Sequence, residues 1–583
     1  MRKIYKELMA ILSTKQKHQM VGIVLMMLVG GILESVGISL IAPVVTVVMD
    51  ETAIEKKKYL SFVYHGLGFE NPMQFTSAIL ILLIFIFVFK NIFLFFLNKV
   101  QLRFVFTNQF ATSQRMMVNF INRPYEYYLN ADTSIIQRMI TSDVINMYGL
   151  ILNVLQLISE AIVFVCLVVL LFVQDAGMTV FIATILVVTL LVIKVFIKPV
   201  MKKSGEENQN FYSGLFKWIS ESVMGIKEIK IASKEGYFID EYSACGNGYV
   251  KAVQRYNLFT ATPRLLIETV AISGMIGYIL MVMRGGIEGA DLIGRLAVLA
   301  MAGSRLLPSA NRINNYQTSI AYFEPFIDNV YNNLQNEIHD TSVKYDPTAY
   351  SRARDAVKMP VKSVIELKNI KYRYPNAESY VLNDADMTIP VGKSVGIVGS
   401  SGAGKTTIVD VMLGLLNIED GSVLADGVNV RDNYQGWLKN IGYIPQTIFM
   451  IDSTIRKNVA FGIKDEDIDD EKVWQALKEA SLDEYVRSLP EGLDTTIGER
   501  GIRLSGGQRQ RIGIARALFE DPEVLVLDEA TSALDGETEK AIMESINSLH
   551  GRKTLIIIAH RLQTIEQCDM VYRIEDGKAV KER

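Results

Sequence analysis

Long apolar stretches recur in roughly the first 325 residues of this 583-residue chain and not in the rest of it. Six stretches are each long enough to cross the ~30 Å hydrocarbon core of a membrane. They lie at 20–49, 76–97, 151–173, 177–197, 257–283 and 291–313. The mean hydropathy of +0.22 is high for a soluble protein. The sequence therefore predicts a polytopic α-helical membrane domain with six transmembrane helices.

The links between these spans differ in length and in charge. Links 174–177 and 284–290 are short, whereas the polar stretches 98–150 and 198–256 are long and rich in lysine and arginine. Because cytoplasmic loops carry an excess of positive charge, the long links and the N-terminus are expected in the cytoplasm. The basic run 55–58 lies in the first external loop and opposes this assignment, which depends on the whole set of links.

The first 18 residues are basic and amphipathic, and no small-residue cleavage site of a signal peptide follows them. We expect a helix that lies on the cytoplasmic membrane surface. An ordinary soluble helix is the alternative.

The composition changes after about Tyr322. Residues 331–358 are polar and mixed in charge, as in a linker, and from Val364 onward short β-rich runs alternate with helical patterns. We therefore expect a transmembrane domain over 1–330 with cytoplasmic helical extensions, a linker over 331–358, and an α/β domain over 359–583. The formal net charge of −3 gives no reason to expect nucleic acid as a partner.

A glycine-rich loop lies between a buried strand pattern and a helical pattern in the α/β region. Residues 399–406, GSSGAGKT, fit the phosphate-binding pattern GxxxxGK[ST]. The glycines allow backbone N–H groups to surround phosphate oxygens, Lys405 can reach the β- and γ-phosphates, and the Thr406 hydroxyl can coordinate Mg²⁺. The nucleotide contacts expected from this loop come from Gly399, Ser400, Gly402, Ala403, Gly404, Lys405, Thr406 and Thr407.

Two carboxylates follow the apolar run that begins at Val524. Asp528 suits Mg²⁺, and Glu529 can polarise a water for in-line attack on a γ-phosphate. An acidic pair that caps a helix is the structural alternative. Between the glycine loop and this pair, Ser505, Gly506, Gly507 and Gln508 begin a helical pattern whose free N–H groups favour anions. One chain does not need two phosphate-binding helix ends for one nucleotide.

These motifs resemble the nucleotide-binding domain of ABC transporters. The glycine loop matches the Walker A motif, LSGGQ matches the signature motif, and residues 525–529 match Walker B and its glutamate. In this family each ATP lies between the Walker A motif of one subunit and the signature motif of the other. The resemblance implies ATP and Mg²⁺ as cofactors and an ATPase coupled to transport.

The resemblance also assigns residues that spacing alone does not. Tyr374 resembles the aromatic residue that stacks on adenine, and Gln446 resembles the Q-loop glutamine that senses γ-phosphate and Mg²⁺. Asp535 closes the D-loop, and His560 resembles the switch histidine. Glu529, His560 and Gln446 are thus the expected catalytic residues, and Thr406, Gln446 and Asp528 the expected metal ligands.

Six spans followed by one cassette resemble an exporter half-transporter, which implies a dimer of two such chains. The coupling helices of this family are expected within the long cytoplasmic links, at about 124–136 and 222–233.

Four cations fall within or beside the spans: Lys90, Arg264, Arg305 and Arg312. A cation inside a membrane usually faces a cavity or a partner. Arg305 and Arg312 are seven residues apart and share a helical face, and Pro308 between them is expected to break or kink the helix. The alternative is internal pairing with Glu34, Glu160 or Glu268, which is favoured for Arg264 because Glu268 lies four residues further on.

A basic cavity of this kind fits a phosphate or pyrophosphate head group. Three segments, ILESVGISLIAP (32–43), TPRLLIE (262–268) and RLLPSANRI (305–313), resemble the flippases for lipid-linked oligosaccharides in bacterial protein glycosylation. This resemblance implies flipping of a polyprenyl-pyrophosphate glycan from the inner to the outer leaflet of the cytoplasmic membrane. In that group the stretch 58–69 would be a short external interfacial helix, and a plain loop is the alternative. Export of a peptide, a drug or another lipid, and an ATP-gated channel or regulator, remain alternative functions.

Overall fold

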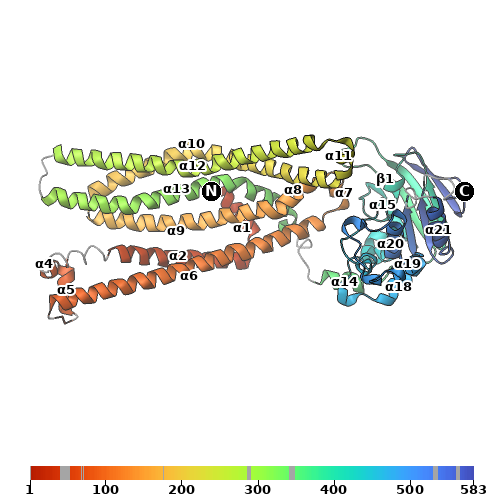
Figure 1. The fold of residues 1–583 in the computed structure, drawn as a ribbon, viewed down its shortest axis with the longest axis horizontal. Coiled ribbons are helices and arrows are strands. Elements are labelled where there is room, and N and C mark those ends of the chain that lie inside the picture. The colour runs from red at the N-terminus through yellow and green to blue at the C-terminus, as the bar shows by residue number, and fades with distance from the viewer. Residues whose placement is uncertain are drawn as a thin grey trace. The chain divides into compact units, whose positions relative to one another are not determined.

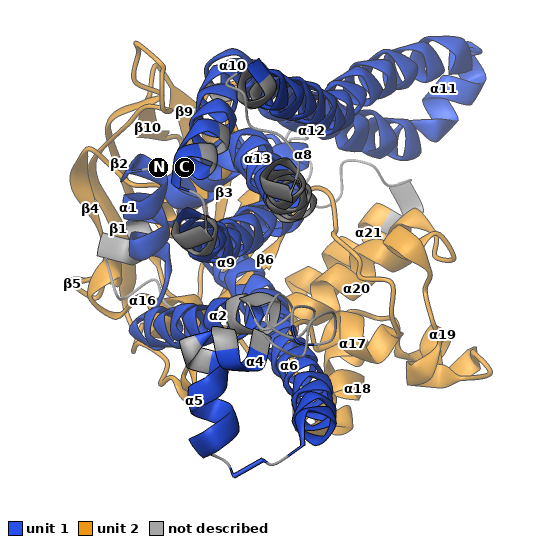
Figure 2. Ribbon diagram, turned by 90° about the vertical axis from the view of Figure 1, so that its left-hand side faces the viewer, with its two compact units in different colours: residues 1–123, 131–345 blue, residues 124–130, 346–583 orange. Residues whose placement is uncertain are grey.

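The computed structural model describes residues 2–39, 47, 53–66, 68–69, 71–174, 176–284, 290–339, 348–529, 536–559 and 565–583, although some side chains inside the helices, Arg305 among them, are not described. The chain forms two compact units, shown in Figure 2. The helical unit comprises residues 1–123 and 131–345, and the α/β unit comprises residues 124–130 and 346–583.

Long helices that run alongside one another build the helical unit (Figure 1). They are α2 (Thr14–Ser39), α6 (Pro72–Ile121), α9 (Val144–Gln174), α10 (Ala176–Met224), α12 (Glu235–Arg284) and α13 (Ala290–His339). Shorter elements are α1 (Arg2–Ile11), α4 (Ala53–Lys56), α5 (Lys58–Gly66), α8 (Thr133–Arg138), the π-helix η1 (Met139–Asp143) and α11 (Ile226–Ala232).

Each predicted span falls largely or wholly on one of the long helices, and the helices are longer than the spans. Four segments of the described chain are long and apolar enough to cross a membrane: Thr14–Glu34, Pro72–Ile121, Thr133–Val169 and Thr179–Met224. Helices α12 and α13 carry the fifth and sixth predicted spans, and parts of their apolar ends lie among the side chains that are not described. The transmembrane helices therefore continue without interruption into the polar stretches that the sequence placed in the cytoplasm.

Two local expectations change, and one open alternative is decided. Residues 2–18 lie in two helices separated at Leu12 and Ser13, and the apolar face of α1 is buried within the protein and faces α13. Lys3 Nζ donates to Asp328 Oδ2 at 2.8 Å across that contact. Helix α13 continues through Pro308 and reaches His339, so the first part of the expected linker is helical. Of the two alternatives for 58–69, the structure has a helix, α5.

Two sheets form the α/β unit. The larger sheet has the strand order β10-β9-β3-β8-β7-β6, in which β6, β7, β8, β3 and β9 are parallel and β10 is antiparallel to β9. The smaller antiparallel sheet has the order β2-β1-β4-β5. Strands β3, β7 and β8 are buried along their whole length, as expected for central parallel strands with both faces covered.

The strands are β1 (Val364–Tyr372), β2 (Leu382–Pro390), β3 (Ser394–Val398), β4 (Asp420–Ala425), β5 (Val428–Asn429), β6 (Ile441–Ile444), β7 (Val524–Asp528), β8 (Thr554–Ile558), β9 (Met570–Glu575) and β10 (Lys578–Lys581). The helices are α7 (Tyr125–Tyr128), α14 (Ala349–Asp355), α15 (Lys405–Met412), α16 (Tyr434–Leu438), α17 (Ile455–Val459), α18 (Asp470–Glu479), α19 (Asp483–Ser488), α20 (Gly506–Leu518) and α21 (Gly536–Asn547).

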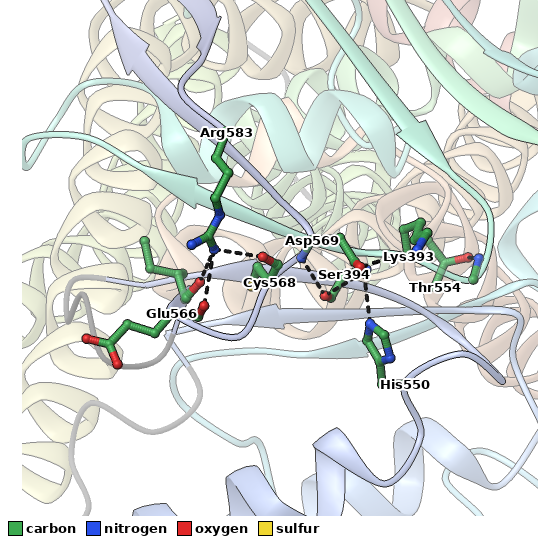
Figure 3. Close-up of polar contacts among 10 residues, drawn as sticks. Lys393, Ser394, His550, Thr554, Glu566, Cys568, Asp569 and Arg583 are labelled. Atoms are coloured by element: carbon green, nitrogen blue, oxygen red, sulfur yellow. Dashed lines mark hydrogen bonds and ion pairs between the residues drawn. The ribbon is translucent and has the colours of Figure 1, made fainter.

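A polar network joins the starts of β3 and β9 to the turn that precedes β8 (Figure 3). Asp569 Oδ2 accepts bonds from the Ser394 backbone N–H at 2.8 Å and from the Ser394 hydroxyl at 3.1 Å, and it lies 2.8 Å from His550 Nε2. Lys393 Nζ lies 3.3 Å from Asp569 Oδ1. Burial raises the pKa of Asp569, but these donors outweigh it and hold that pKa well below its usual range. The network therefore ties three segments of the sheet together.

The segment Pro124–Asn130, which lies between two parts of the helical unit in the chain, belongs to the α/β unit. Glu126 Oε1 accepts from the Asn417 backbone N–H at 2.8 Å, and Glu126 Oε2 accepts from Asn417 Nδ2 at 3.1 Å. Arg431 in turn donates to Asn417 Oδ1 at 2.8 Å. Helix α7 is thus fixed to the loop that follows α15. The second candidate coupling segment contains α11.

Candidate active site

The glycine loop lies between β3 and α15, as the sequence predicts. Gly404 precedes α15 with φ of +100°, a conformation that residues with a side chain rarely adopt. A Cβ built on Gly404 would lie 3.1 Å from Val381 Cγ1, so a side chain here would add a tight contact to the strain of the backbone angle. The loop therefore brings the first turn of α15, with its free N–H groups, to the end of a central strand.

Lys405 is 5% exposed, and its ammonium donates to two carbonyl oxygens of the same loop. These are Gly399 O at 3.1 Å and Ser400 O at 3.0 Å. The charge is therefore held at the loop. Thr406 is exposed beside it, whereas Thr407 is buried and its hydroxyl lies 2.9 Å from the Tyr374 hydroxyl. The expected adenine-stacking tyrosine is thus attached to the first turn of α15.

Two buried carboxyl groups lie close to the glycine loop. Asp528 is 6% exposed, and its Oδ2 accepts from the Tyr443 hydroxyl at 3.2 Å. Burial raises the pKa of Asp528 and Glu529 adds to that effect, while Tyr443 and Lys405 oppose it. Asp410 on α15 is 9% exposed, and burial together with the charge of Asp528 raises its pKa to about 6. Negative charge is concentrated here, at a place suited to a divalent cation.

Glu529 follows Asp528 at the end of β7 and adopts φ of +47°. Its backbone N–H donates to Ile558 O at 3.1 Å, and Gln446 Nε2 donates to Glu529 Oε2 at 2.8 Å. The structure thus brings together the two residues that the sequence assigns to water activation and γ-phosphate sensing.

No group of three or more His, Cys, Asp or Glu side chains with metal-ligand geometry occurs among the described residues. A metal ion at Asp528 would therefore need ligands from nucleotide phosphates, hydroxyl or amide groups, or water. This is how Mg²⁺ is usually held in ATP sites, so Thr406, Gln446 and Asp528 form a suitable donor set.

The signature segment begins α20. Ser505 is the N-cap residue, and its hydroxyl accepts from the Gln508 backbone N–H at 3.2 Å. Gln508 Oε1 accepts from the Ser505 backbone N–H at 2.8 Å, which completes a capping box. Because its side chain is used in this cap, Gln508 stabilises the helix start, and the adjacent Gly506 and Gly507 present the helix N-terminus. Asp535 and His560 lie outside the described residues.

Three of the four candidate cations, Lys90, Arg264 and Arg312, have side chains that the structure describes, and their surroundings differ. Arg312 Nε and Nη2 donate to the two oxygens of Glu160 at 2.8 and 3.0 Å, and the Ser309 hydroxyl donates to Glu160 Oε1 at 2.5 Å. The Arg312 side chain nevertheless remains 49% exposed. Arg264 Nε donates to Glu268 Oε1 at 2.9 Å, as its spacing predicted. The Lys90 ammonium lies 4.8 Å from the centre of the Phe87 ring.

Sequence reasoning did not identify two residues that the structure places at this site, Tyr443 and Asp410. Tyr443 lies in β6, three residues before Gln446. It is close to Asp528 because β6 pairs with β7, and the sequence alone does not reveal which strands are neighbours. Asp410 faces the site only because α15 begins at Lys405. No sequence signal separates these residues from ordinary core or surface positions.

Two family models match the chain. One, described as the ABC transporter transmembrane region, matches residues 20–287, and the other, described as ABC transporter, matches residues 382–532.

Several relatives are named ATP-dependent lipid A-core flippases. One from Bordetella avium is 29% identical over 475 residues, which is 80% of this chain and 78% of the relative. One from Haemophilus influenzae is 43% identical over 225 residues, which is 38% of each chain.

A solved structure of a bacterial Atm1-family ABC exporter with ATP bound has a TM-score of 0.75 and 20% identity, and the match covers 97% of this chain and 95% of that one. The chain thus has an exporter fold, with a membrane-spanning helical region joined to an α/β cassette. It belongs to the ABC transporters, the family in which ATP hydrolysis by such a cassette drives transport across a membrane.

Proposed function

We propose that this chain uses ATP to flip an anionic glycolipid from the inner to the outer leaflet of the cytoplasmic membrane. The specific substrate that we propose is a lipid-linked, polyprenyl-pyrophosphate oligosaccharide. A lipid A-core type of glycolipid is the second candidate, because several relatives carry that function in their names. Both molecules combine phosphate groups, sugars and long hydrocarbon chains.

The observation that carries the ATPase half is the contact between Gln446 and Glu529 beside the buried Asp528. In the proposed reaction Glu529 accepts a proton from the water that attacks the γ-phosphate, and Gln446 orients the Glu529 carboxylate. Lys405 binds the β- and γ-phosphates, Tyr374 stacks on adenine, and His560 acts as the switch histidine. A bound Mg²⁺, held by Thr406, Gln446 and Asp528, would neutralise phosphate charge.

The proposed substrate contacts are the four cations of the helical unit that the sequence singled out, Lys90, Arg264, Arg305 and Arg312. Arg312 is held in a two-bond pair by Glu160 and remains half exposed. A guanidinium whose plane is fixed in this way is suited to a phosphate, since less conformational entropy is lost on binding. Lys90, Arg264 and Arg305 are proposed as further head-group contacts. Of these, Arg264 also forms an ion pair with Glu268.

The proposed working unit is a homodimer, with the helical unit as the transmembrane domain and the cassette in the cytoplasm. One Walker A motif and one signature motif per chain support it. Further support comes from an apolar groove of about 410 Å³ around α11, whose lining includes Trp218, Ile226 and Phe238. A soluble surface rarely leaves such a groove uncovered, and in this proposal the second copy covers it.

The head-group assignment can be tested by comparing Arg312→Ala with Glu160→Gln in nanodiscs. If Arg312 binds phosphate, Arg312→Ala removes the stimulation of ATPase activity by glycolipid, whereas Glu160→Gln keeps the cation and an acceptor oxygen for it and so retains most of that stimulation. If the pair only stabilises the helix bundle, both substitutions lower the melting temperature to a similar degree and change stimulation alike. Equal effects of the two substitutions would therefore contradict the assignment.

A further inference from the structure

The Tyr443 hydroxyl donates to Asp528 Oδ2 at 3.2 Å, and Asp528 is the carboxylate that the proposed function assigns to Mg²⁺. Tyr443 lies on β6 and Asp528 ends β7, and these two strands are parallel neighbours in which Tyr443 pairs with Val526. Because Asp528 lies two residues beyond Val526, the backbone pairing places Tyr443 and Asp528 on the same face of neighbouring strands. Among the residues that the structure describes, Tyr443 is the side chain that donates a hydrogen bond to Asp528.

The charges around this pair show why a neutral donor is useful. Asp410 and Glu529 add negative charge near Asp528, and Lys405 supplies positive charge from the glycine loop. A cationic donor on Asp528 would compete with a metal ion for the carboxylate. A phenol satisfies one oxygen of Asp528 and leaves the negative charge of the group in place.

We propose that Tyr443 is a positioning residue that fixes Oδ2 of Asp528 and thereby holds Oδ1 in the orientation that Mg²⁺ requires. This inference rests on the proposed ATPase function and assigns a role to a residue outside the known motifs of the chain. It predicts that removing the Tyr443 hydroxyl group weakens the binding of Mg²⁺ without altering the nucleotide pocket.

The test uses the full-length chain with Glu529→Gln, which is expected to bind ATP without hydrolysing it. Binding of a fluorescent ATP analogue is measured in Mg²⁺ and in EDTA, so that the ratio of the two affinities reports the contribution of the metal. Tyr443→Phe should lower this ratio about tenfold, as expected for loss of a hydrogen bond to a charged group. The affinity in EDTA should stay unchanged.

A matched control is Tyr572→Phe, which also removes a tyrosine hydroxyl from the sheet. Tyr572 accepts from the Thr388 backbone N–H at 3.2 Å and donates to Thr388 O at 3.1 Å. This control should leave the ratio at its original value. With Glu529 restored, Tyr443→Phe should raise the Mg²⁺ concentration for half-maximal ATPase activity, and excess Mg²⁺ should recover kcat.

An unchanged affinity ratio in Tyr443→Phe would overturn the inference. This includes an equal loss of affinity in Mg²⁺ and in EDTA, because an equal loss indicates a general effect on folding. Failure of the parent protein to bind ATP in either medium would instead contradict the proposed function. The two failures are therefore distinguishable.

Discussion

Glu529 leaves β7 in a left-handed backbone conformation with φ of +47°. For a residue with a side chain this costs on the order of 1–2 kcal/mol. The Glu529 N–H bond to Ile558 and the side-chain bond from Gln446 hold the residue in this state. Strain of this kind clusters at functional sites, and here it follows directly after the buried Asp528. Glu529, the residue to which the sequence assigns water activation, thus has an unusual backbone conformation.

Asp569 illustrates a residue whose contribution is to stability. Asp569→Asn should lower the stability of the α/β unit at pH 7 by about 1–2 kcal/mol, because a charged acceptor of several hydrogen bonds is lost. The fold lowers the pKa of Asp569, so its stabilisation is present above the ordinary aspartate pKa of about 3.9 and is lost as pH falls through the folded-state value. The difference from wild type should therefore shrink below about pH 4.

This prediction is checked by following thermal unfolding of the full chain at pH 7 and at successively lower pH. Asp576→Asn is the matched control, since Asp576 is an exposed residue in the turn between β9 and β10. A destabilisation by Asp569→Asn that stays constant down to pH 3 would show that the Asp569 charge is not its cause.

At the scale of single elements, α7 is a helix of four residues, one of which bonds to the loop that follows α15. Glu126 accepts both bonds from Asn417, and Arg431 fixes Asn417 from the other side. Burial and the charge of Asp410 raise the pKa of Tyr125 in the same helix, so α7 is electrostatically close to α15. We therefore expect a movement of α7 to displace α15, the helix that begins at Lys405.

Glu126→Ala should separate ATPase activity from its stimulation by substrate. Basal activity should persist because the catalytic groups are unaltered, while stimulation by glycolipid should fall about tenfold for a loss of 1–2 kcal/mol of coupling. The measurement is phosphate release in nanodiscs with and without glycolipid. Glu491→Ala, at an exposed glutamate elsewhere in the α/β unit, is the control. Full stimulation in Glu126→Ala would rule out α7 as the coupling element.

The elements differ in how far the sequence could predict them. The long helices and the strands around the glycine loop follow from apolar periodicity and from a motif whose spacing the chemistry itself requires. The continuation of α13 to His339 does not, because Pro308 predicts a break or kink and the polar composition from residue 331 onward predicts a linker. The membership of α7 in the α/β unit and the bond from Tyr443 to Asp528 depend on contacts between residues far apart in sequence.

At the scale of the whole molecule, the central prediction concerns the pairing of two chains. Ser400→Cys and Ser505→Cys, introduced together after replacement of Cys166, Cys245 and Cys568, place one thiol in the glycine loop and one at the signature helix. Oxidation with ATP and Mg²⁺ bound should give covalent dimers, because each ATP is expected between the glycine loop of one chain and the signature helix of the other. Disulfides formed solely within single chains would contradict this arrangement.

ATP-driven translocation in proteoliposomes tests the proposed flipping of a lipid-linked oligosaccharide directly. Lipid-linked oligosaccharide with a radiolabelled glycan is incorporated symmetrically, and an enzyme outside the vesicles releases the glycans that it can reach. With ATP supplied to cassettes on the outer surface, the flipped glycan should become protected at a rate that exceeds the ATP-free control. Glu529→Gln should abolish that protection. Glycan accessibility that is independent of ATP, in vesicles where the wild-type chain hydrolyses ATP normally, would contradict the proposed function.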